Sequence, residues 1–265
     1  MDIEKINQAA DILYNSRIFL KKISELPKNC IPQNKTDAYA IQDMLVKKYI
    51  LNDKHLTVIG KKVGCTNIAA QKQINVTEPF YGNIFSQYSS KSNCLIKAES
   101  FFSPSIEPEF SFIINTELDI SKAPFTSKEV YKSIDSVLPS IELVDARYTN
   151  WETVGINNLI ADNAANAYWI YGHEVNSLES FDFSDHPVLV YINDKIVDKG
   201  NANNVLNNPI NSLTWLINTL ANQGRSLKKN NYVSTGTCTP AILINKGDRI
   251  CADFGKLGKV KFSFI

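Results

Sequence analysis

From about Leu56 onward the chain is a succession of short apolar runs separated by glycine, asparagine, aspartate and proline. Runs of this length that are bounded by turn residues predict β-strands joined by hairpins. Turns are expected at 193–194 and at 246–248, because asparagine, aspartate and glycine adopt the backbone angles that tight turns need. The runs read LTVIGKKVG, IEPEFSFII, VLPSIELVDA, VLVYIN, ILINKGDRICADFG and KVKFSFI.

The first third of the chain carries apolar residues at helical spacing instead. Two helical runs are expected there, the second ending at Leu26. A break follows between Pro27 and Pro32, after which Thr36 or Asp37 is placed to cap a further helix. The block has the pattern of a helical cover on a core rather than that of a free domain.

One strong helix interrupts the strand-like runs, from Pro209 to Gly224. Its leucines and isoleucines follow helical spacing, and glycine is a natural residue at the end of a helix. The whole pattern predicts an α+β fold. We expect residues 1–55 to form a helical region packed on a β-rich core of residues 56–265, the two making one structural unit.

Composition and charge argue against several classes of function. The formal net charge is +1 over 265 residues, so bulk attraction to nucleic acid or to an anionic membrane is not expected. No apolar run approaches the ~20 residues that span a bilayer, and the N-terminus lacks the layout of a signal peptide. Five widely spaced cysteines without a CxxC pair predict reduced thiols and a cytoplasmic location.

The segment Ser105–Phe112 carries the most chemical information. If it is a strand, Glu107, Glu109 and Ser111 share one face, while apolar side chains on the other face anchor it in the core. Two carboxylates that close repel each other unless a cation compensates, and Mg²⁺ prefers carboxylate oxygens at about 2.0–2.1 Å. The alternative is a half-exposed strand with two solvated glutamates. Pro108 has no backbone N–H to donate to a neighbouring strand, which indicates a position at a sheet edge.

A third carboxylate, Glu142, lies inside the apolar run VLPSIELVDA. An acid in such a run is either paired or bound to a ligand. The alternative to a metal ligand is a buried salt bridge to Arg147, although Arg147 could instead pair with Asp145. Three carboxylates suit Mg²⁺ or Mn²⁺ better than Zn²⁺. The histidines show no ligand spacing: His55, His173 and His186.

A lysine between glycines is the next candidate, in the strand-like segment Gly60–Asn67. Glycines let a ligand approach the backbone closely, and we expect Gly64 and Thr66 to contact a substrate. Lys62, if it faces an acidic metal site, could bind a carboxylate or act in acid–base chemistry with a lowered pKa. The alternative is an ordinary exposed lysine beside Lys61.

Two further segments carry polar groups that could reach a ligand. In 160–166, small residues surround Asp162 and Asn163, which could line a pocket, and a cap at the start of a helix is the alternative. In the hydroxyl-rich segment 234–240, interpreted as a loop, Thr237 could hydrogen-bond a substrate carboxylate, and a plain turn is the alternative. The sequence contains no nucleophile elbow, P-loop or dinucleotide-binding fingerprint.

Six segments in the same order resemble the 2-keto-4-pentenoate hydratase / 4-oxalocrotonate decarboxylase family, within the fumarylacetoacetate hydrolase superfamily. The resemblance covers nearly the whole chain. Its segments are DAYAIQ, VIGKKVGCTNIAAQKQINVTEPFYGNIF, IEPEFSF, IELVDARYTNW followed by IADNAANA, the helix from Pro209 to Gly224, and TGTCTPAILINKGDRICADFGKLGKVKF.

The resemblance implies a mixed β-sandwich roll with helices in the N-terminal part, and a homo-oligomer. It implies metal ligands at Glu107, Glu109 and Glu142, and the family's G-x-K-x-G pattern selects Lys62 over Lys61 as the active-site lysine. It further implies a metal-dependent lyase, a hydratase or a decarboxylase. Its cofactor would be Mg²⁺ or Mn²⁺ and its substrate a small 2-oxo or 2-hydroxydienoic acid.

Two departures from the family pattern bear on the reaction. Family hydratases often read E-P-D-Y-G where this chain reads EPFYG, so that Phe80 stands in place of the aspartate. The family's A-D-N-A-S reads ADNAA here, so that Ala165 stands in place of the serine. Hydration needs a placed water and a general base, whereas decarboxylation needs no such base and an apolar wall favours loss of charge. Phe80 therefore favours decarboxylase-like chemistry, unless Glu78 or Tyr81 supplies the missing group. The run at 148–151 also resembles family decarboxylases.

Three rival functions stay open at this point: hydrolysis of an acylpyruvate carbon–carbon bond, decarboxylation of oxaloacetate, and a catalytically inactive binding protein. The ADN-type block disfavours the first two. The retained glutamates and lysine disfavour the third. Turnover of a panel of 2-oxo acids, with and without EDTA, distinguishes these functions.

Overall fold

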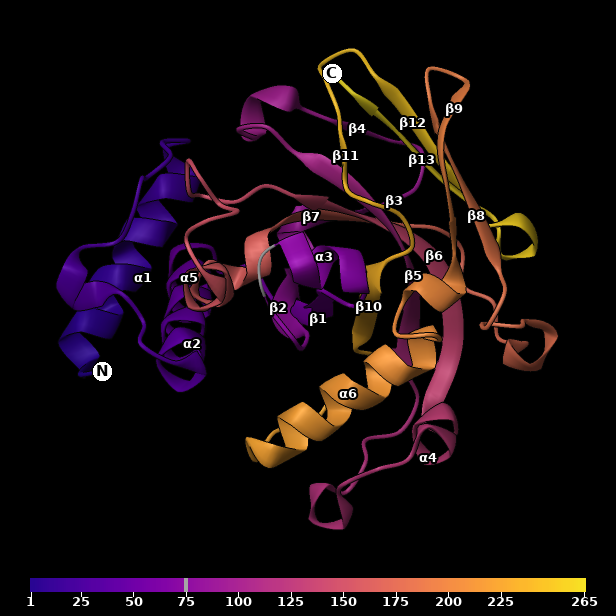
Figure 1. The fold of residues 1–265 in the computed structure, drawn as a ribbon, viewed down its shortest axis with the longest axis horizontal. Coiled ribbons are helices and arrows are strands. Elements are labelled where there is room, and N and C mark those ends of the chain that lie inside the picture. Colours follow the sequence, from indigo (N-terminus) through magenta and orange to yellow (C-terminus); the bar gives the residue numbers. More distant parts are fainter. Residues whose placement is uncertain (74–75) are drawn as a thin grey trace.

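The computed structural model describes residues 1–73 and 76–265 of the chain. Two curled sheets form the centre of the fold, and the N-terminal helices lie at one side of them (Figure 1). The predicted α+β class with a helical N-terminal region is confirmed. None of the helices in the described residues combines the length and the apolar character that crossing a membrane requires.

The larger sheet consists of β1 Val58–Gly64, β2 Phe80–Phe85, β3 Ser89–Lys91, β5 Ser105–Ile114, β6 Ile134–Val144, β7 Asn166–Tyr171, β10 Tyr232–Thr237 and β11 Ile242–Leu243. Its order is β2-β1-β10-β5-β6-β7-β3, with β11 paired to β5. Most neighbours are antiparallel, but β1 pairs with β10 and β3 with β7 in parallel. The β1–β10 pair brings the lysine-bearing segment close to the two long central strands β5 and β6.

The smaller sheet consists of β4 Cys94–Ile96, β8 Pro187–Ile192, β9 Lys195–Asn201, β12 Arg249–Asp253 and β13 Lys259–Phe264. Its order is β4-β13-β12-β8-β9. The expected hairpin turn joins β8 to β9 through Asn193 and Asp194, with φ values of 51° and 65°. Positive values at both positions are what a two-residue turn of this kind requires. Gly247, in the expected turn before β12, has a φ of 97°.

The helices are α1 Ile3–Ile18, α2 Lys35–Asn52, α3 Ile68–Gln73, α4 Ser127–Tyr131, α5 Ile156–Ala161 and α6 Pro209–Asn222. Helices α1 and α2 pack side by side, and α5 lies against α2 (Figure 1). The prediction for α6 is confirmed. Asn208 caps its start by accepting a hydrogen bond from the amide of Ile210, and the chain leaves its end through Gly224 at a φ of 70°.

Strand β5 separates the main core from the candidate site. Its even-numbered side chains Ile106, Phe110 and Phe112 are fully buried in the largest apolar cluster, which both sheets and α6 share. Phe110, for example, meets Phe254 edge-on with ring centroids 5.2 Å apart. Because side chains alternate along a strand, the odd-numbered residues of β5 project to the opposite face. The apolar core therefore anchors a strand whose other face is polar.

Two expectations for the N-terminal region are wrong. Helix α1 ends at Ile18, where Leu20 adopts a left-handed φ of 47°, and no α-helix reaches Leu26. Leu26 is instead buried against the helices as part of a connecting segment. The cap of α2 is Asn34, whose side chain accepts a hydrogen bond from the amide of Asp37. The observed cap therefore lies two residues before Thr36 and three before Asp37, the two predicted caps.

Pro108 does not mark a sheet edge, because β5 lies between β10 and β6. The Pro108 carbonyl accepts a hydrogen bond from the amide of Cys238 (2.9 Å), so its missing N–H faces β10. The register of β10 shifts at this place, between Ser234 and Thr237. A bulge of this kind leaves one ladder position unpaired, and the proline occupies it without the loss of a hydrogen bond.

Candidate metal centre

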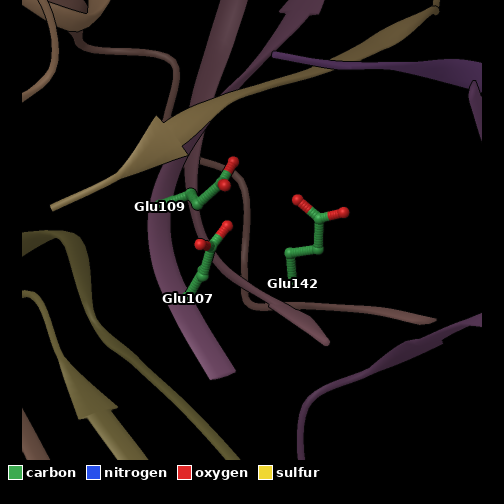
Figure 2. A group of neighbouring side chains, drawn as sticks. All are labelled: Glu107, Glu109 and Glu142. Atoms are coloured by element: carbon green, nitrogen blue, oxygen red, sulfur yellow. The ribbon is translucent and has the colours of Figure 1, made fainter. Parts of the chain in front are cut away.

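The two long central strands bring the predicted glutamates together. In the antiparallel pair of β5 and β6, Glu107 lies directly opposite Glu142, and Glu109 lies two residues further on the same face of β5. Figure 2 shows the three carboxylates turned toward one another. One oxygen from each residue lies within 4.8 Å of the others. The alternative of two solvated glutamates is wrong, since the cluster lies inside the protein.

The carboxylate oxygens fit a divalent cation. Glu109 and Glu142 are fully buried, and Glu107 is half-buried. Among the described residues, Glu109 Oε1 has no hydrogen-bond partner, and Glu142 Oε2 has only an ion-pair contact with Lys62. Buried oxygens without partners are costly unless a ligand binds them. Three hard oxygen donors without a histidine or cysteine match the preference of Mg²⁺ and Mn²⁺.

The three carboxyl groups hinder one another's ionisation. Burial, together with the charge of Glu142, raises the pKa of Glu107 to about 7. Burial and the two neighbouring glutamates raise the pKa of Glu109 well above its ordinary value. Burial also raises the pKa of Glu142, although the Lys62 ammonium opposes that shift. A cation among them supplies the positive charge that holds all three groups as carboxylates.

Lys62 reaches the same centre from β1. Its side chain is almost fully buried, and its Nζ lies 3.1 Å from Glu142 Oε2. The ammonium also donates a 3.0 Å hydrogen bond to the carbonyl oxygen of Ala164. Burial alone lowers the pKa of Lys62, but the charges of Glu142 and Glu107 outweigh burial, and the pKa is raised overall. Lys62 is therefore a buried lysine paired with Glu142, and the alternative of an exposed lysine is wrong.

A strained backbone segment presents the Ala164 carbonyl to this lysine. Asn163, Ala164 and Ala165 have φ values of 51°, 55° and 58°, and each left-handed residue other than glycine costs roughly 1–2 kcal/mol. The Asn163 side chain holds the segment against β2: its Oδ1 accepts from the amide of Asn83 (2.8 Å), and its Nδ2 donates to the Asn83 carbonyl (3.0 Å). The contacts of Asn163 thus position the partner of Lys62.

Three residues that the predicted site did not include hold the glutamates in place. Asn166 Nδ2 donates to Glu142 Oε1 (2.9 Å). Ser234 Oγ and the amide of Gly236 both donate to Glu109 Oε2, at 2.5 and 3.0 Å. The interpretation of 234–240 as a loop is wrong at its start, because Ser234 and Gly236 belong to strand β10. Only the register of β10 against β5 reveals their contact with Glu109.

The predicted substrate-contact residues on β1 and after it lie beside the centre. Gly64 is two residues beyond Lys62, and a Cβ added to it would lie 3.4 Å from Lys62 Nζ. Thr66 is buried against Gly236, and its Oγ1 has no hydrogen-bond partner in the described part of the chain. Thr237 lies opposite Glu109, with its Oγ1 donating to the Thr239 carbonyl (2.7 Å). Their contact with a substrate stays a prediction.

Asp162 makes contacts of a different kind. It is fully buried, its Oδ2 accepts a 2.9 Å hydrogen bond from the amide of Arg147, and its Oδ1 forms an ion pair with Arg147 Nε. Arg147 also donates to the backbone carbonyls of Asp145 and Asn166, each at 3.0 Å. The alternatives in which Arg147 forms its salt bridge with Glu142 or with the Asp145 carboxylate are therefore wrong. The contacts of Asp162 support the fold around the centre.

Phe80 lies on the same face of the sheet as the lysine. In the β1–β2 register, Gly64 is opposite Phe80 and Lys62 is opposite Gly82, and cross-strand partners project to one face. A Cβ added to Gly64 would lie 3.2 Å from Phe80 Cζ, so the ring tip and the ammonium flank the glycine. The ring packs in an apolar cluster with Ala38, Ile160 and Ala164.

Neither neighbour of Phe80 supplies a polar group in its place. Glu78 forms an exposed ion pair with Lys35. Tyr81 is fully buried, and its hydroxyl donates to Gln223 Oε1 (2.6 Å). Burial raises the pKa of Tyr81 to about 12, so this phenol stays protonated. The side chain that β2 places beside Gly64 is therefore the apolar one of Phe80.

Comparison with known proteins gives these features a family context. The family model of the fumarylacetoacetate (FAA) hydrolase C-terminal region matches residues 54–265. The TodF product hydratase of Pseudomonas putida is 28% identical over 261 residues, which cover 98% of this chain and 95% of that protein. The 2-oxo-hept-4-ene-1,7-dioate hydratase of Escherichia coli is 32% identical and covers 86% of each chain.

A solved structure gives the same result for the whole fold. The 4-oxalocrotonate decarboxylase from Pseudomonas putida G7, complexed with magnesium and adipate, matches with a TM-score of 0.92 at 27% identity. The match covers 100% of this chain and 99% of that one. It confirms the predicted fold and the resemblance that the six sequence segments indicated. The chain belongs to the fumarylacetoacetate hydrolase family.

Proposed function

We propose that the protein is a divalent-metal-dependent lyase that acts on a small 2-oxo or 2-hydroxydienoic acid, and that it releases CO₂ from an unsaturated 2-oxo diacid. The observation that carries the proposal is the buried cluster of Glu107, Glu109 and Glu142 beside the Lys62 ammonium. Solved relatives are complexed with magnesium, calcium or manganese, which supports a divalent ion. We propose Mg²⁺ or Mn²⁺ because all three ligands are carboxylates.

The three glutamates would hold the ion, which supplies a Lewis acid that polarises the 2-oxo group of a substrate. Lys62 adds a fixed positive charge on one side of this centre. An ammonium held by Glu142 and by the Ala164 carbonyl keeps its position without a substrate. Its charge can therefore orient a second carboxylate at no cost in reorganisation. Gly64 carries no side chain between the Phe80 ring and the Lys62 Nζ, where a Cβ would lie 3.2 and 3.4 Å from them.

Decarboxylation follows from the apolar wall at Phe80. In 2-oxo-3-hexenedioate the bond between C5 and C6 breaks, its electron pair enters the conjugated system that ends at the 2-oxo oxygen, and C6 leaves as CO₂. The dienolate then takes up one proton. A carboxylate beside the Phe80 ring is poorly solvated, and its loss as neutral CO₂ relieves that cost. Adipate, a six-carbon diacid, is present in the decarboxylase of known structure.

Hydration of a 2-hydroxydienoate is the second candidate, because several relatives are hydratases. It requires a group that places and deprotonates water. On the described part of β2 no ionisable side chain faces Lys62: Phe80 and Gly82 lie on that face, and the Tyr81 hydroxyl binds Gln223. For this reason we propose hydration as the second candidate.

The deciding experiment offers purified protein 2-oxo-3-hexenedioate and 2-hydroxy-2,4-pentadienoate side by side under saturating Mg²⁺. We expect CO₂ release from the diacid, slow hydration of the dienoate, and loss of both activities in EDTA. Phe80→Asp should shift the ratio toward hydration, while Phe80→Leu, the matched apolar control, should not. Efficient hydration without CO₂ release would make the preference for decarboxylation wrong. No turnover of either compound would favour a binding protein.

We also propose self-association and a cytoplasmic location. Phe19 and Leu51 expose 74% and 79% of their surface, and apolar side chains this exposed are typical of contact surfaces when they gather in patches. All five cysteines are free thiols, which supports a reducing compartment. Size-exclusion chromatography with light scattering tests the first proposal, and a monomer at micromolar concentration would contradict it.

A further inference from the structure

Three buried serines from three neighbouring strands meet behind Glu109. Ser111 of β5, Ser140 of β6 and Ser234 of β10 are all fully buried. Ser111 Oγ lies 2.7 Å from Ser140 Oγ and 3.1 Å from Ser234 Oγ. The last pair, Ser140 and Ser234, is 3.3 Å apart. Three buried hydroxyl groups that bond one another bury little apolar surface. Their position beside Glu109, a proposed metal ligand, therefore needs an explanation.

The cluster is joined to Glu109 at two points. Ser234 Oγ donates to Glu109 Oε2, which also accepts from the amide of Gly236. Ser140 Oγ donates to the backbone carbonyl of Glu109 (3.1 Å). The second carboxylate oxygen, Oε1, has no partner among the described residues. One oxygen of Glu109 is therefore held twice, while the other has no partner in the described residues, and the carboxylate lies beside those of Glu107 and Glu142 (Figure 2).

Trp169 determines the direction of this hydrogen-bond chain. Its indole Nε1 donates to Ser234 Oγ (3.2 Å), and an indole N–H can only donate. Ser234 must therefore accept from Trp169, and its single proton is free to go to Glu109. Trp169 is fully buried and lies opposite Glu142 in the β6–β7 register, so the indole has no other conformation open to it without repacking.

We infer that Ser234, oriented by Trp169, is a positioning residue that holds Glu109 Oε2 and thereby turns Oε1 toward the cation. The inference rests on the proposed metal centre and adds to it a residue outside the ligand set. A serine that donates to a ligand carboxylate keeps that ligand in one rotamer before the ion arrives. Residues that orient metal ligands typically change affinity by about 10–100-fold when replaced.

The test measures the Kd of Mn²⁺ by isothermal titration calorimetry on the full chain. Ser234→Ala should raise this Kd by about 10–100-fold. Ser234→Cys keeps the shape but has a weak donor, so it should raise the Kd in the same direction. The matched control is Ser136→Ala, since Ser136 is an equally buried serine of β6 whose Oγ has no partner in the described residues. Its Kd should equal that of the wild type.

A second readout separates positioning from general destabilisation. Trp169→Phe removes the indole donor but leaves Ser234 intact, so its Kd for Mn²⁺ should also rise, by less than in Ser234→Ala. The thermal unfolding midpoints of metal-free Ser234→Ala and Trp169→Phe should not follow the order of their Kd values. Wild-type Kd values in both Ser234→Cys and Trp169→Phe would overturn the inference while the metal centre stands. Absence of Mn²⁺ binding to the wild type would overturn the metal centre and this inference together.

Discussion

Replacing Arg147 by methionine tests whether Asp162 supports the fold or binds substrate. Asp162 is fully buried, and Arg147 supplies its ion pair and one of its backbone hydrogen bonds. Removal of one partner from a buried ion pair costs about 3–5 kcal/mol, because the other charge stays behind unpaired. In a chain of this size each kcal/mol lowers the unfolding midpoint by roughly 2–4 °C, so the expected decrease is about 6–20 °C.

The assay combines thermal and urea unfolding with steady-state kinetics at saturating Mg²⁺. Asp162→Asn should lower the urea midpoint while KM of the folded enzyme changes by less than about twofold. The double variant Arg147→Met with Asp162→Leu should regain part of the lost stability, since apolar replacement of a whole buried pair is often tolerated. The reasoning is refuted if Arg147→Met unfolds at the wild-type midpoint. It is equally refuted if Asp162→Asn raises KM more than about tenfold at unchanged stability.

Three further outcomes are expected. Lys62→Met should lower kcat/KM at least about 100-fold. Lys61→Met should change kcat/KM little, because Lys61 Nζ binds Asn83 Oδ1 on the opposite face of β1. Equal losses in both variants would contradict this face assignment. Glu107→Gln should abolish Mg²⁺ binding in calorimetry. The fold of this variant should survive, because one of three repelling charges is removed. Full wild-type activity in EDTA would refute the metal requirement. Because the pKa of Glu107 is raised from 4.5 to about 7, Mn²⁺ affinity should rise with pH up to about 8 and binding should release protons. The metal-free protein should also lose stability as pH rises from 4.5 to 7, because the unfolded chain has already released the proton that Glu107 retains in the folded protein. A Mn²⁺ affinity that does not change between pH 6 and 8 would contradict the raised pKa of Glu107.

The sequence was informative where local pattern alone decides the outcome. Alternation along Ser105–Phe112 indicated that Glu107, Glu109 and Ser111 share one face, and β5 has that arrangement. Helical spacing likewise indicated α6 almost to its ends. Both features depend only on the 2.0- and 3.6-residue periods of strands and helices, which a single segment reveals without its neighbours.

What pattern could not predict depends on strand order and register. Pro108 suggested an edge strand, but a bulge in β10, far along the chain, accommodates it in the middle of the sheet. Arg147 was expected to pair with Glu142 or Asp145, but its ion pair is with Asp162. Ser234 stood in an apparent loop, and only the pairing of β10 with β5 brings it to Glu109. Each of these contacts joins residues that are distant in the sequence.

The placement of two proposed metal ligands, Glu107 and Glu142, directly opposite each other has a consequence for the order of folding. Strands β5 and β6 follow each other in the larger sheet and are antiparallel, so their pairing closes only the connection of residues 115–133, which costs less chain entropy than a connection across most of the chain. Strand β1 joins the sheet through its parallel pairing with β10, near the other end of the chain, and contacts of such long range form slowly. We therefore expect Glu107 and Glu142 to meet before Lys62 joins them. A cation present during synthesis can enter the nascent pair of strands before the ammonium that later contacts Glu142 is in place.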